Sequence, residues 1–358
     1  MNEGLKMSIL GEIADLIDSN AYTNGPQVSE FEEAFAKYCG ATFCVGVASG
    51  LDALRFALLA LGLEPGDEVI VPAQTFVATF EAITQARGTP VVVDVGCVDY
   101  CIDSTTVEAA ITRRTRAIIP VHLYGQLADM RELLRIASKH DLAVVEDACQ
   151  AHGASRDGVV AGAGGTAAAF SFYPGKNLGA IGDAGALVTD DADVTELARA
   201  LREHGQRAKY DHVIEGYTSR LDTIQALVLR QKLPLLDAWN DQRRRVARAY
   251  GELLDGVGDL VLPPVPEGSE PAWHLYVVQT RDPDRLASHL RRRRIESGRH
   301  YPEPPHLTRA YRYLGYSRGA FPVAEELADR CLSLPIFPGM TDEQVERTAT
   351  AVAAFFDG

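Results

Sequence analysis

One lysine of the sequence stands in a setting that suits covalent chemistry. Lys176 follows an apolar run and a Pro-Gly turn, in the segment FSFYPGK (170–176), and a glycine-rich stretch comes directly after it. A lysine held at the end of a rigid strand and shielded from water has a depressed pKa and can form a Schiff base with an aldehyde. Taken alone, the pattern also fits a surface lysine in a turn.

An aspartate follows a second buried run. Asp147 ends the segment LAVVED (142–147), and at the carboxyl edge of a parallel sheet a carboxylate faces the ligand crevice. A carboxylate in that place can keep a heteroaromatic nitrogen protonated, although Asp147 alone could equally be a helix N-cap. Together, Lys176 for an aldehyde and Asp147 for a ring nitrogen are the pair expected of a pyridoxal 5'-phosphate (PLP) site.

A third element suits the phosphate of such a cofactor. The segment VASGLDAL (47–54) is a turn of small residues that opens a helix. The free N–H groups at a helix start form an anion site. A glycine at a helix start is weak evidence by itself, but beside Lys176 and Asp147 it completes a consistent set.

These residues need a sheet to position them. Short β-branched runs at 67–72, 89–95, 115–122 and 142–148 are continuous enough to be strands buried on both faces. Between them lie segments with helical periodicity, such as LDALRFALLALG and ADMRELLRIASKH. The alternation predicts a three-layer α/β/α fold with a mostly parallel sheet.

The last third of the chain has a different pattern. Two long helices are expected on either side of Pro234, and a strand at 273–280 follows a proline-rich loop. Further helices are expected at about 283–293, 321–331 and 341–356. We therefore expect a large PLP-binding domain over 1–240 and a smaller C-terminal α+β domain over 241–358.

Composition limits which partners the protein is expected to bind and in which cellular compartment it is expected to lie. The 358 residues include 49 acidic and 35 basic side chains, for a net charge of −14, which disfavours nucleic acid and anionic membranes. The N-terminal segment reads as an amphipathic helix and not as a signal peptide. The six cysteines match no metal-binding spacing, so we expect free thiols, no metal site and a cytoplasmic protein.

The longer motifs resemble a known family. VASGLDALRFAL, PAQTFVATFEAI, PVHLYGQLADM, VVEDACQAHGA, FSFYPGKNLGAIGDAGALVT, GYTSRLDTIQA and HYPEPPHL occur in order along nearly the whole chain. In this they resemble the nucleotide-diphospho-sugar aminotransferases of the DegT/DnrJ/StrS type, which are fold type I PLP enzymes. A histidine in place of Lys176 would be typical of the related dehydratases.

The resemblance implies a role for each residue of the cofactor site. Lys176 carries the cofactor aldehyde, and Asp147 pairs with the pyridine nitrogen. Gln150 reaches the ring 3-hydroxyl, and Phe76 stacks on the exposed face of the ring, unless it is a core aromatic of the helix that contains FVATFEAI. The phosphate is held by Ser171, Gly50 and Leu51, and by Thr218, Ser219 and Arg220 from the neighbouring subunit of a homodimer.

Two of these positions depart from the family pattern. The family usually reads Gly-Thr where this chain has Gly50-Leu51, so a hydroxyl donor to the phosphate is lost. It usually reads Asn-Ser-Arg where this chain has Thr218-Ser219-Arg220, and threonine can still donate one hydrogen bond but has a shorter reach than an amide. A hydrogen bond to a charged group is worth about 1.5–3 kcal/mol, so we expect weaker cofactor binding but a retained activity. The substrate residues implied by the resemblance are Tyr124, Tyr173, His300, Tyr301 and His306.

The resemblance also implies the reaction. It is transfer of an amino group from L-glutamate to a nucleotide-linked sugar ketone, by way of pyridoxamine phosphate. Members reading YPGKNLGA followed by GDAG mostly act at C3, which predicts a thymidine-diphospho-3-keto-6-deoxyhexose acceptor and a 3-amino sugar for a secondary metabolite. A 4-keto sugar, an inosose-type cyclitol and a non-catalytic PLP-binding regulator are the alternatives.

Overall fold

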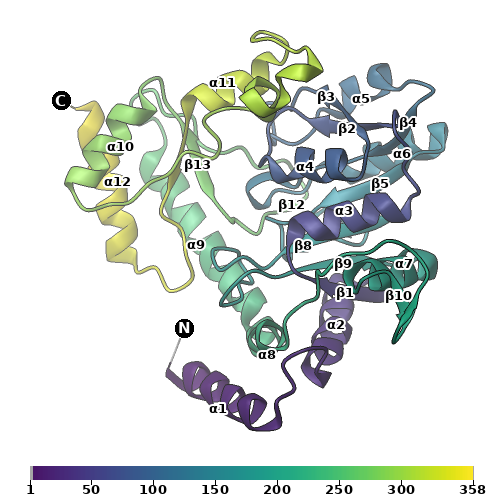
Figure 1. Cartoon of the computed structure of the whole chain (residues 1–358). Helices are drawn as coiled ribbons and strands as arrows, with labels where there is room; N and C mark the ends of the chain where they lie inside the picture. The colour runs from purple at the N-terminus through teal and green to yellow at the C-terminus, as the bar shows by residue number, and fades with distance from the viewer. Residues whose placement is uncertain (1–2, 358) are drawn as a thin grey trace.

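A seven-stranded sheet forms the centre of the structure, a computed structural model that describes residues 3–357 (Figure 1). Its strand order is β1-β9-β8-β5-β4-β2-β3. β9 runs antiparallel to both neighbours, and the other neighbouring pairs are parallel. The strands are β1 (Phe43–Val47), β2 (Glu68–Pro72), β3 (Thr89–Val93), β4 (Thr115–Ile118), β5 (Ala143–Asp147), β8 (Ala167–Ser171) and β9 (Gly185–Thr189). The predicted mostly parallel α/β sheet is confirmed.

Helices cover this sheet. α3 (Gly50–Ala60) packs against β8 and β9 and lies between α4 (Ala78–Gln85) and α7 (Ala192–Arg202), as the front of Figure 1 shows. Other strands are packed by α2 (Pro26–Cys39), which contacts β1, by α5 (Ser104–Ala110), which contacts β3, and by α6 (Met130–His140), which contacts β5. The strands are buried because helices pack against them, which explains their unbroken apolar runs.

The N-terminal helix packs against the start of the last third of the chain. α1 (Glu3–Ser19) buries Ile9 and Leu16 against Leu227 and Val228 of α8 (Thr223–Lys232). After α8 come a 3-10 turn, η2 (Leu233–Leu235), and α9 (Leu236–Leu254). The expected break at Pro234 is therefore a single turn of 3-10 helix, because proline cannot donate the α-helical hydrogen bond.

A second hydrophobic core lies in the C-terminal third. β13 (Tyr276–Gln279) pairs antiparallel with β14 (Cys331–Leu334). The core packs side chains of this ribbon with those of α9, α10 (Pro283–Arg292) and α12 (Asp342–Phe356). α11 (Pro322–Arg330) instead contributes Ala324 and Leu327 to the main core. The division at residue 240 stays a prediction.

Short elements complete the chain. A three-stranded sheet is made of β12 (Ser269–Glu270), β6 (Ser155–Arg156) and β7 (Val159–Val160), and a hairpin of β10 (Gln206–Ala208) and β11 (Asp211–His212). The remaining 3-10 turns are η1 (Leu123–Gly125), η3 (Pro305–Leu307) and η4 (Arg309–Leu314). All six cysteines are free thiols, and within residues 3–357 no helix is long and apolar enough to cross a membrane.

Candidate active site

The candidate residues gather at the carboxyl edge of the parallel strands. β5 ends at Asp147 and β8 ends at Ser171, while the chain leaving β2 reaches Phe76 within four residues. The chain leaving β1 enters α3 at Gly50. Because the carboxyl ends of parallel strands meet at one edge, segments distant in sequence converge there, as open α/β sheets require of a ligand site.

Asp147 is buried and its two carboxylate oxygens are fixed separately. Oδ2 accepts a 2.7 Å hydrogen bond from the hydroxyl of Thr79, and Oδ1 accepts a 3.2 Å bond from the backbone N–H of Cys149. No helix starts after Asp147, since the chain passes through a turn into β6. Through its bond to Cys149, Asp147 therefore caps this turn and not a helix.

Lys176 lies in the turn after β8, where its backbone N–H bonds to the carbonyl of Tyr173 at 2.8 Å. Its side chain is half-buried. Burial lowers the pKa of its ammonium group, against the opposing influence of Cys149 and Asp147. Lys176 is thus not a freely solvated surface lysine, and its amine is more available as a nucleophile than an exposed one. Tyr173, beside it, is 58% exposed.

Gly50 and Ser171 approach each other closely at the start of α3. A Cβ at Gly50 would lie 2.8 Å from that of Ser171 and 2.6 Å from the Cys149 sulfur, so the backbone packs where no side chain fits. Ser49 caps the helix by accepting from the N–H of Asp52 at 3.1 Å. The N–H groups of Gly50 and Leu51 precede the first helical bond and are available to an anion.

Phe76 and Tyr301 form an aromatic pair at this edge. Their ring centroids lie 5.4 Å apart at an interplanar angle of 38°. Phe76 is 51% exposed and precedes α4, which begins at Ala78. Both the placement of Phe76 on the helix and its alternative as a core aromatic are therefore wrong. Its exposed ring is suited to cover the face of a planar cofactor.

Gln150 connects two tyrosines. Its Oε1 accepts from the backbone N–H of Tyr124 at 2.7 Å, and its Nε2 donates to the hydroxyl of Tyr301 at 3.1 Å. Tyr124 is buried and donates its own hydroxyl to the carbonyl of His300. Burial, reinforced by Asp147, raises the pKa of Tyr301, so its hydroxyl stays protonated at neutral pH. The structure thus brings Gln150, Tyr301 and His300 together.

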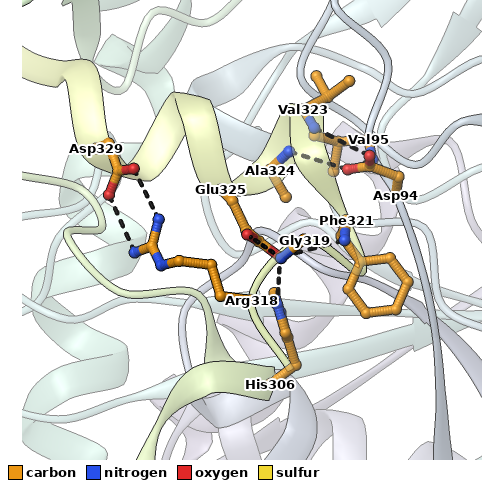
Figure 2. A network of polar contacts seen from close by, with 10 residues as sticks. All are labelled: Asp94, Val95, His306, Arg318, Gly319, Phe321, Val323, Ala324, Glu325 and Asp329. Carbon is orange, nitrogen blue, oxygen red and sulfur yellow. Dashed lines mark hydrogen bonds and ion pairs between the residues drawn. The ribbon is translucent and has the colours of Figure 1, made fainter. Parts of the chain in front are cut away.

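His306 is not brought to the site. Its ring is fully buried and packs edge-on against Phe321, with the ring centroids 4.8 Å apart. Its Nε2 lies 3.3 Å from Oε1 of Glu325. Figure 2 shows that Glu325 also accepts from the N–H groups of Gly319 and Phe321. The expectation that His306 contacts substrate is corrected, because a ring enclosed in this way holds the loop and leaves no face for a ligand.

The segment proposed to serve a neighbouring subunit makes contacts within its own chain. Ser219 is buried and donates to the carboxylate of Asp52 at 2.6 Å, and Arg220 pairs with Glu203 at 3.2 Å. Thr218 is exposed beside His204. Of the three side chains, that of Thr218 is the exposed one, and its hydroxyl lies 3.3 Å from Nε2 of His204 in the same chain.

Sequence reasoning missed three polar residues around the site. Thr79 fixes Asp147, and Asn177, next to Lys176, lies 3.3 Å from the ring of His274. His274 precedes β13 and is far from the other site residues in sequence. The sequence contained a weak signal for His274, because the start of a buried strand is an unusual position for a polar ring.

The residues present fit PLP. The structure supplies a fixed carboxylate, a lysine with a lowered pKa, an exposed aromatic face and a helix start closed against Ser171. The carboxylate suits the pyridine nitrogen of PLP, and the lysine suits its aldehyde. The aromatic ring suits the face of the cofactor ring, and the helix start suits the phosphate. The close approach at Gly50 supports this fit, because it sets the N–H groups at the start of α3 directly beside Ser171.

Comparison with known proteins gives the family. The model of the DegT/DnrJ/EryC1/StrS aminotransferase family matches residues 4–353. The chain belongs to this family. It is 47% identical over 350 residues to dTDP-3-amino-3,4,6-trideoxy-alpha-D-glucose transaminase of Streptomyces venezuelae, a match that covers 98% of this chain and 92% of that one.

Two further relatives support the assignment to this aminotransferase family. dTDP-3-amino-3,6-dideoxy-alpha-D-galactopyranose transaminase of Aneurinibacillus thermoaerophilus is 44% identical over 337 residues, covering 94% of this chain and 92% of that one. The crystal structure of S. venezuelae DesV in complex with a ketimine intermediate matches with a TM-score of 0.97 at 46% identity, over 99% of this chain and 96% of that one. The predicted family, aminotransferase activity and PLP cofactor are confirmed.

Proposed function

We propose that this aminotransferase moves an amino group from L-glutamate to C3 of a thymidine-diphosphate-linked 3-keto-6-deoxyhexose. The placement of Lys176 and Asp147 at one sheet edge carries the proposal, because a PLP transaminase needs both. The names of two relatives, from S. venezuelae and A. thermoaerophilus, both describe transaminases of 3-amino sugars. The product would be a 3-amino sugar destined for a secondary metabolite, made in the cytoplasm.

Each residue of the site has a defined task. When bound, PLP supplies an electron sink that stabilises the charge left when a C–H bond at the amine-bearing carbon breaks. Asp147, held by Thr79 and Cys149, keeps the ring nitrogen protonated. Lys176, whose pKa is lowered by burial, takes the proton from the donor carbon and gives it back later in the transfer.

The sugar is expected to lie between the lysine turn and the loop at 300–302. Tyr173 is exposed beside Lys176, and Tyr301 is held by Gln150. His300 is fixed by a 2.8 Å contact between its Nδ1 and the hydroxyl of Ser333. These three side chains set the orientation of the hexose, and Tyr124 supports the loop through the carbonyl of His300.

We further propose a homodimer in which Thr218 completes the phosphate site of the neighbouring subunit. Its side chain is exposed at the edge of a segment that Ser219 and Arg220 fix from within the same chain. A donor from the partner would add to the N–H groups of Gly50 and Leu51 and the hydroxyl of Ser171.

The donor half of the reaction is tested with the PLP-loaded enzyme alone. Addition of L-glutamate should bleach the cofactor absorbance and release one equivalent of 2-oxoglutarate per site. The Lys176→Ala variant should show neither change. If the wild-type spectrum does not respond to any amino donor while the variant keeps its biological role, the protein is a PLP-binding regulator and the proposal fails.

The acceptor is tested by running the reaction backwards. Thymidine-diphospho 3-amino and 4-amino 6-deoxyhexoses are offered to the PLP form with 2-oxoglutarate, and glutamate formation is measured. We expect turnover of the 3-amino compound. Turnover of the 4-amino compound alone would show that the site acts at C4. An aminocyclitol without a nucleotide is the third arm, and its turnover would replace the sugar nucleotide by an inosose as acceptor.

A further inference from the structure

The turn at 48–52, which opens α3 and is called the phosphate cradle below, is held by a side chain distant in sequence. The hydroxyl of Ser219 accepts a 3.3 Å hydrogen bond from the backbone N–H of Ala48. The same hydroxyl donates a 2.6 Å hydrogen bond to Oδ2 of Asp52. Ser219 is buried, and its one hydroxyl therefore contacts both ends of the cradle from within the same chain.

The backbone around these contacts is fixed as well. Arg220 forms an antiparallel β-bridge with Val47, the last residue of β1. Behind the turn, a Cβ on Gly185 of β9 would lie 2.3 Å from the carbonyl carbon of Ser49, so the cradle packs directly against the backbone of β9. The Ser219 hydroxyl thus meets a turn that has little freedom to move away from it.

Asp52 brings a negative charge to the helix start where a phosphate is proposed to bind. It is the third residue of α3, and its N–H donates to the hydroxyl of Ser49 at 3.1 Å. Both of its carboxylate oxygens have partners, since Oδ2 accepts from Ser219 and Oδ1 accepts from Arg55. The guanidinium carbon of Arg55 lies 4.1 Å from the ring centroid of Tyr217. Two anions at one helix start repel each other, so these two donors lessen the repulsion by holding and balancing the carboxylate.

The number of hydroxyl protons decides what Ser219 can do. A serine hydroxyl has a single proton to donate, and Ser219 donates it to the charged Asp52 of its own chain. An O–H···O⁻ bond of this length is one of the stronger hydrogen bonds in proteins. The family resemblance implies that Ser219 donates to the phosphate in the neighbouring subunit, which would require this bond to break.

We propose that Ser219 is a positioning residue for the cofactor phosphate, and that it acts on the cradle of its own chain by holding the carboxylate of Asp52. The inference rests on the proposed function, in which the phosphate lies at the N–H groups of Gly50 and Leu51. A carboxylate released by Ser219 would be free to turn toward those N–H groups and compete with the phosphate for them. Thr218 remains the residue proposed to reach the partner.

The proposal is tested by comparing PLP with pyridoxal, which has the same ring and aldehyde but no phosphate. Each is titrated into the cofactor-free protein, and the Schiff-base absorbance gives its dissociation constant. In Ser219→Ala we expect the constant for PLP to rise about tenfold, as for loss of one hydrogen bond to a charged group, and that for pyridoxal to stay within twofold. Equal changes for the two compounds would indicate a general loosening of the site and would overturn the proposal.

A double-mutant cycle shows whether Ser219 acts through Asp52. Asp52→Asn removes the charge, so Ser219→Ala added to it should raise the PLP constant less than about threefold. An undiminished effect in the Asn background would mean that Ser219 contacts the phosphate itself, and the proposal would fail. Ser219→Thr should keep the wild-type constant, and Ser219→Cys, with its weaker donor, gives the same comparison if the alanine variant does not fold.

Mixed dimers assign the effect to one subunit. One subunit carries Ser219→Ala and keeps Lys176, and the other carries Lys176→Ala and keeps Ser219. The Schiff-base absorbance then reports only the site that keeps its lysine, and this site should bind PLP about tenfold more weakly than in wild type. Wild-type binding there would place Ser219 in the site of its partner and overturn the proposal. A monomer with the same weakened binding would refute the proposed dimer alone.

Controls separate this inference from the proposed function. Ser29→Ala, whose hydroxyl donates to the carbonyl of Pro26 in α2, should leave both dissociation constants unchanged. Unchanged PLP binding in Ser219→Ala, with normal transamination in wild type, would overturn the role of Ser219 and leave the transaminase proposal intact. The expected dissociation constants without any transamination would do the reverse.

Discussion

The hydroxyl of Thr79 lies 2.7 Å from Oδ2 of Asp147, and both groups are fully or almost fully buried. Thr79 is the second residue of α4, a helix that begins after β2, whereas Asp147 ends β5. The bond fixes the orientation of the carboxylate that is proposed to pair with the pyridine nitrogen. The same hydroxyl lies 2.8 Å from that of Thr75, which fixes its direction.

We expect Thr79→Val to weaken cofactor binding and slow the donor half-reaction. A hydrogen bond to a charged acceptor is worth about 1.5–3 kcal/mol, so each effect should be about tenfold or more. Titration with PLP and stopped-flow absorbance measure the two quantities. Thr79→Ser should recover both, and Thr84→Val, whose hydroxyl donates to carbonyls within α4 rather than to Asp147, serves as the control.

Gly50→Ala should close the phosphate cradle. The added Cβ would meet the sulfur of Cys149 at 2.6 Å and Ser171 at 2.8 Å, distances that require the start of α3 to move away. The dissociation constant for PLP should rise more than tenfold, as measured by equilibrium dialysis. Gly11→Ala is the control, because a Cβ there meets nothing within 4 Å and alanine favours the helix. Unchanged PLP binding in Gly50→Ala would place the phosphate elsewhere.

Tyr301→Phe removes the hydroxyl that accepts from Gln150 while keeping the aromatic contact with Phe76. Gln150 then loses one partner, and a neutral hydrogen bond is worth about 0.5–1.5 kcal/mol. We expect kcat/KM for the sugar to fall about threefold to tenfold, with PLP binding nearly unchanged. Steady-state kinetics measure this, and Tyr313→Phe, an exposed tyrosine, should have no effect. A large loss of PLP affinity would show instead that Tyr301 holds the cofactor.

The Glu325 network in Figure 2 predicts a loss of stability in acid. Burial opposes ionisation of Glu325, but donors from Gly319, Phe321 and His306 keep its pKa below the ordinary value. A lowered folded-state pKa stabilises the fold above the unfolded pKa of about 4.3, and this contribution is lost as the pH falls through the folded value. Burial also lowers the pKa of His306, so the unfolded state binds a proton more readily below about pH 6.5 and the fold loses stability there too.

Glu325→Gln should lower the free energy of unfolding by about 1–3 kcal/mol at pH 7, because buried donors lose their charged acceptor. The difference from wild type should shrink only as the pH falls below about 4.3 towards the folded-state pKa, which urea titrations at several pH values can measure. Arg318→Ala, in the same network but in an exposed pair with Asp329, should cost less than about 1 kcal/mol. A pH-independent difference would mean that Glu325 is not ionised in the folded protein.

Mixed dimers test whether the phosphate site is shared. Thr218→Asp places a negative charge where the partner is proposed to meet the phosphate, so this variant alone should bind PLP poorly. In a mixed dimer, one subunit carries Thr218→Asp and keeps Lys176, and the other carries Lys176→Ala and keeps Thr218. One site then contains both intact residues only if Thr218 of each subunit enters the site of its partner. Recovery of up to half of the wild-type activity per mixed dimer is expected, and no recovery would assign Thr218 to its own subunit.

The sequence alone determined the central sheet and the two residues at the centre of the proposed chemistry, Lys176 and Asp147. Continuous β-branched runs predicted buried parallel strands, because a strand that is covered on both faces needs apolar residues at every position. Lys176 and Asp147 were found because a residue at the end of a buried parallel strand, or in the turn after it, lies at the carboxyl edge wherever the strand is placed in the sheet. The cradle at Gly50 was visible for the same reason, since a helix start is a local feature.

Tertiary structure decided what each side chain meets. His306 resembled a substrate ligand in the sequence, but Glu325, nineteen positions away, encloses it. Phe76, expected on a helix, is 51% exposed and lies before α4, which begins at Ala78. Thr79 and His274 became visible only when α4 and the loop before β13 were packed against the sheet edge. Hydrogen bonds between segments more than 60 residues apart leave no periodic trace in a sequence, because they depend on how the elements pack and not on what each element is.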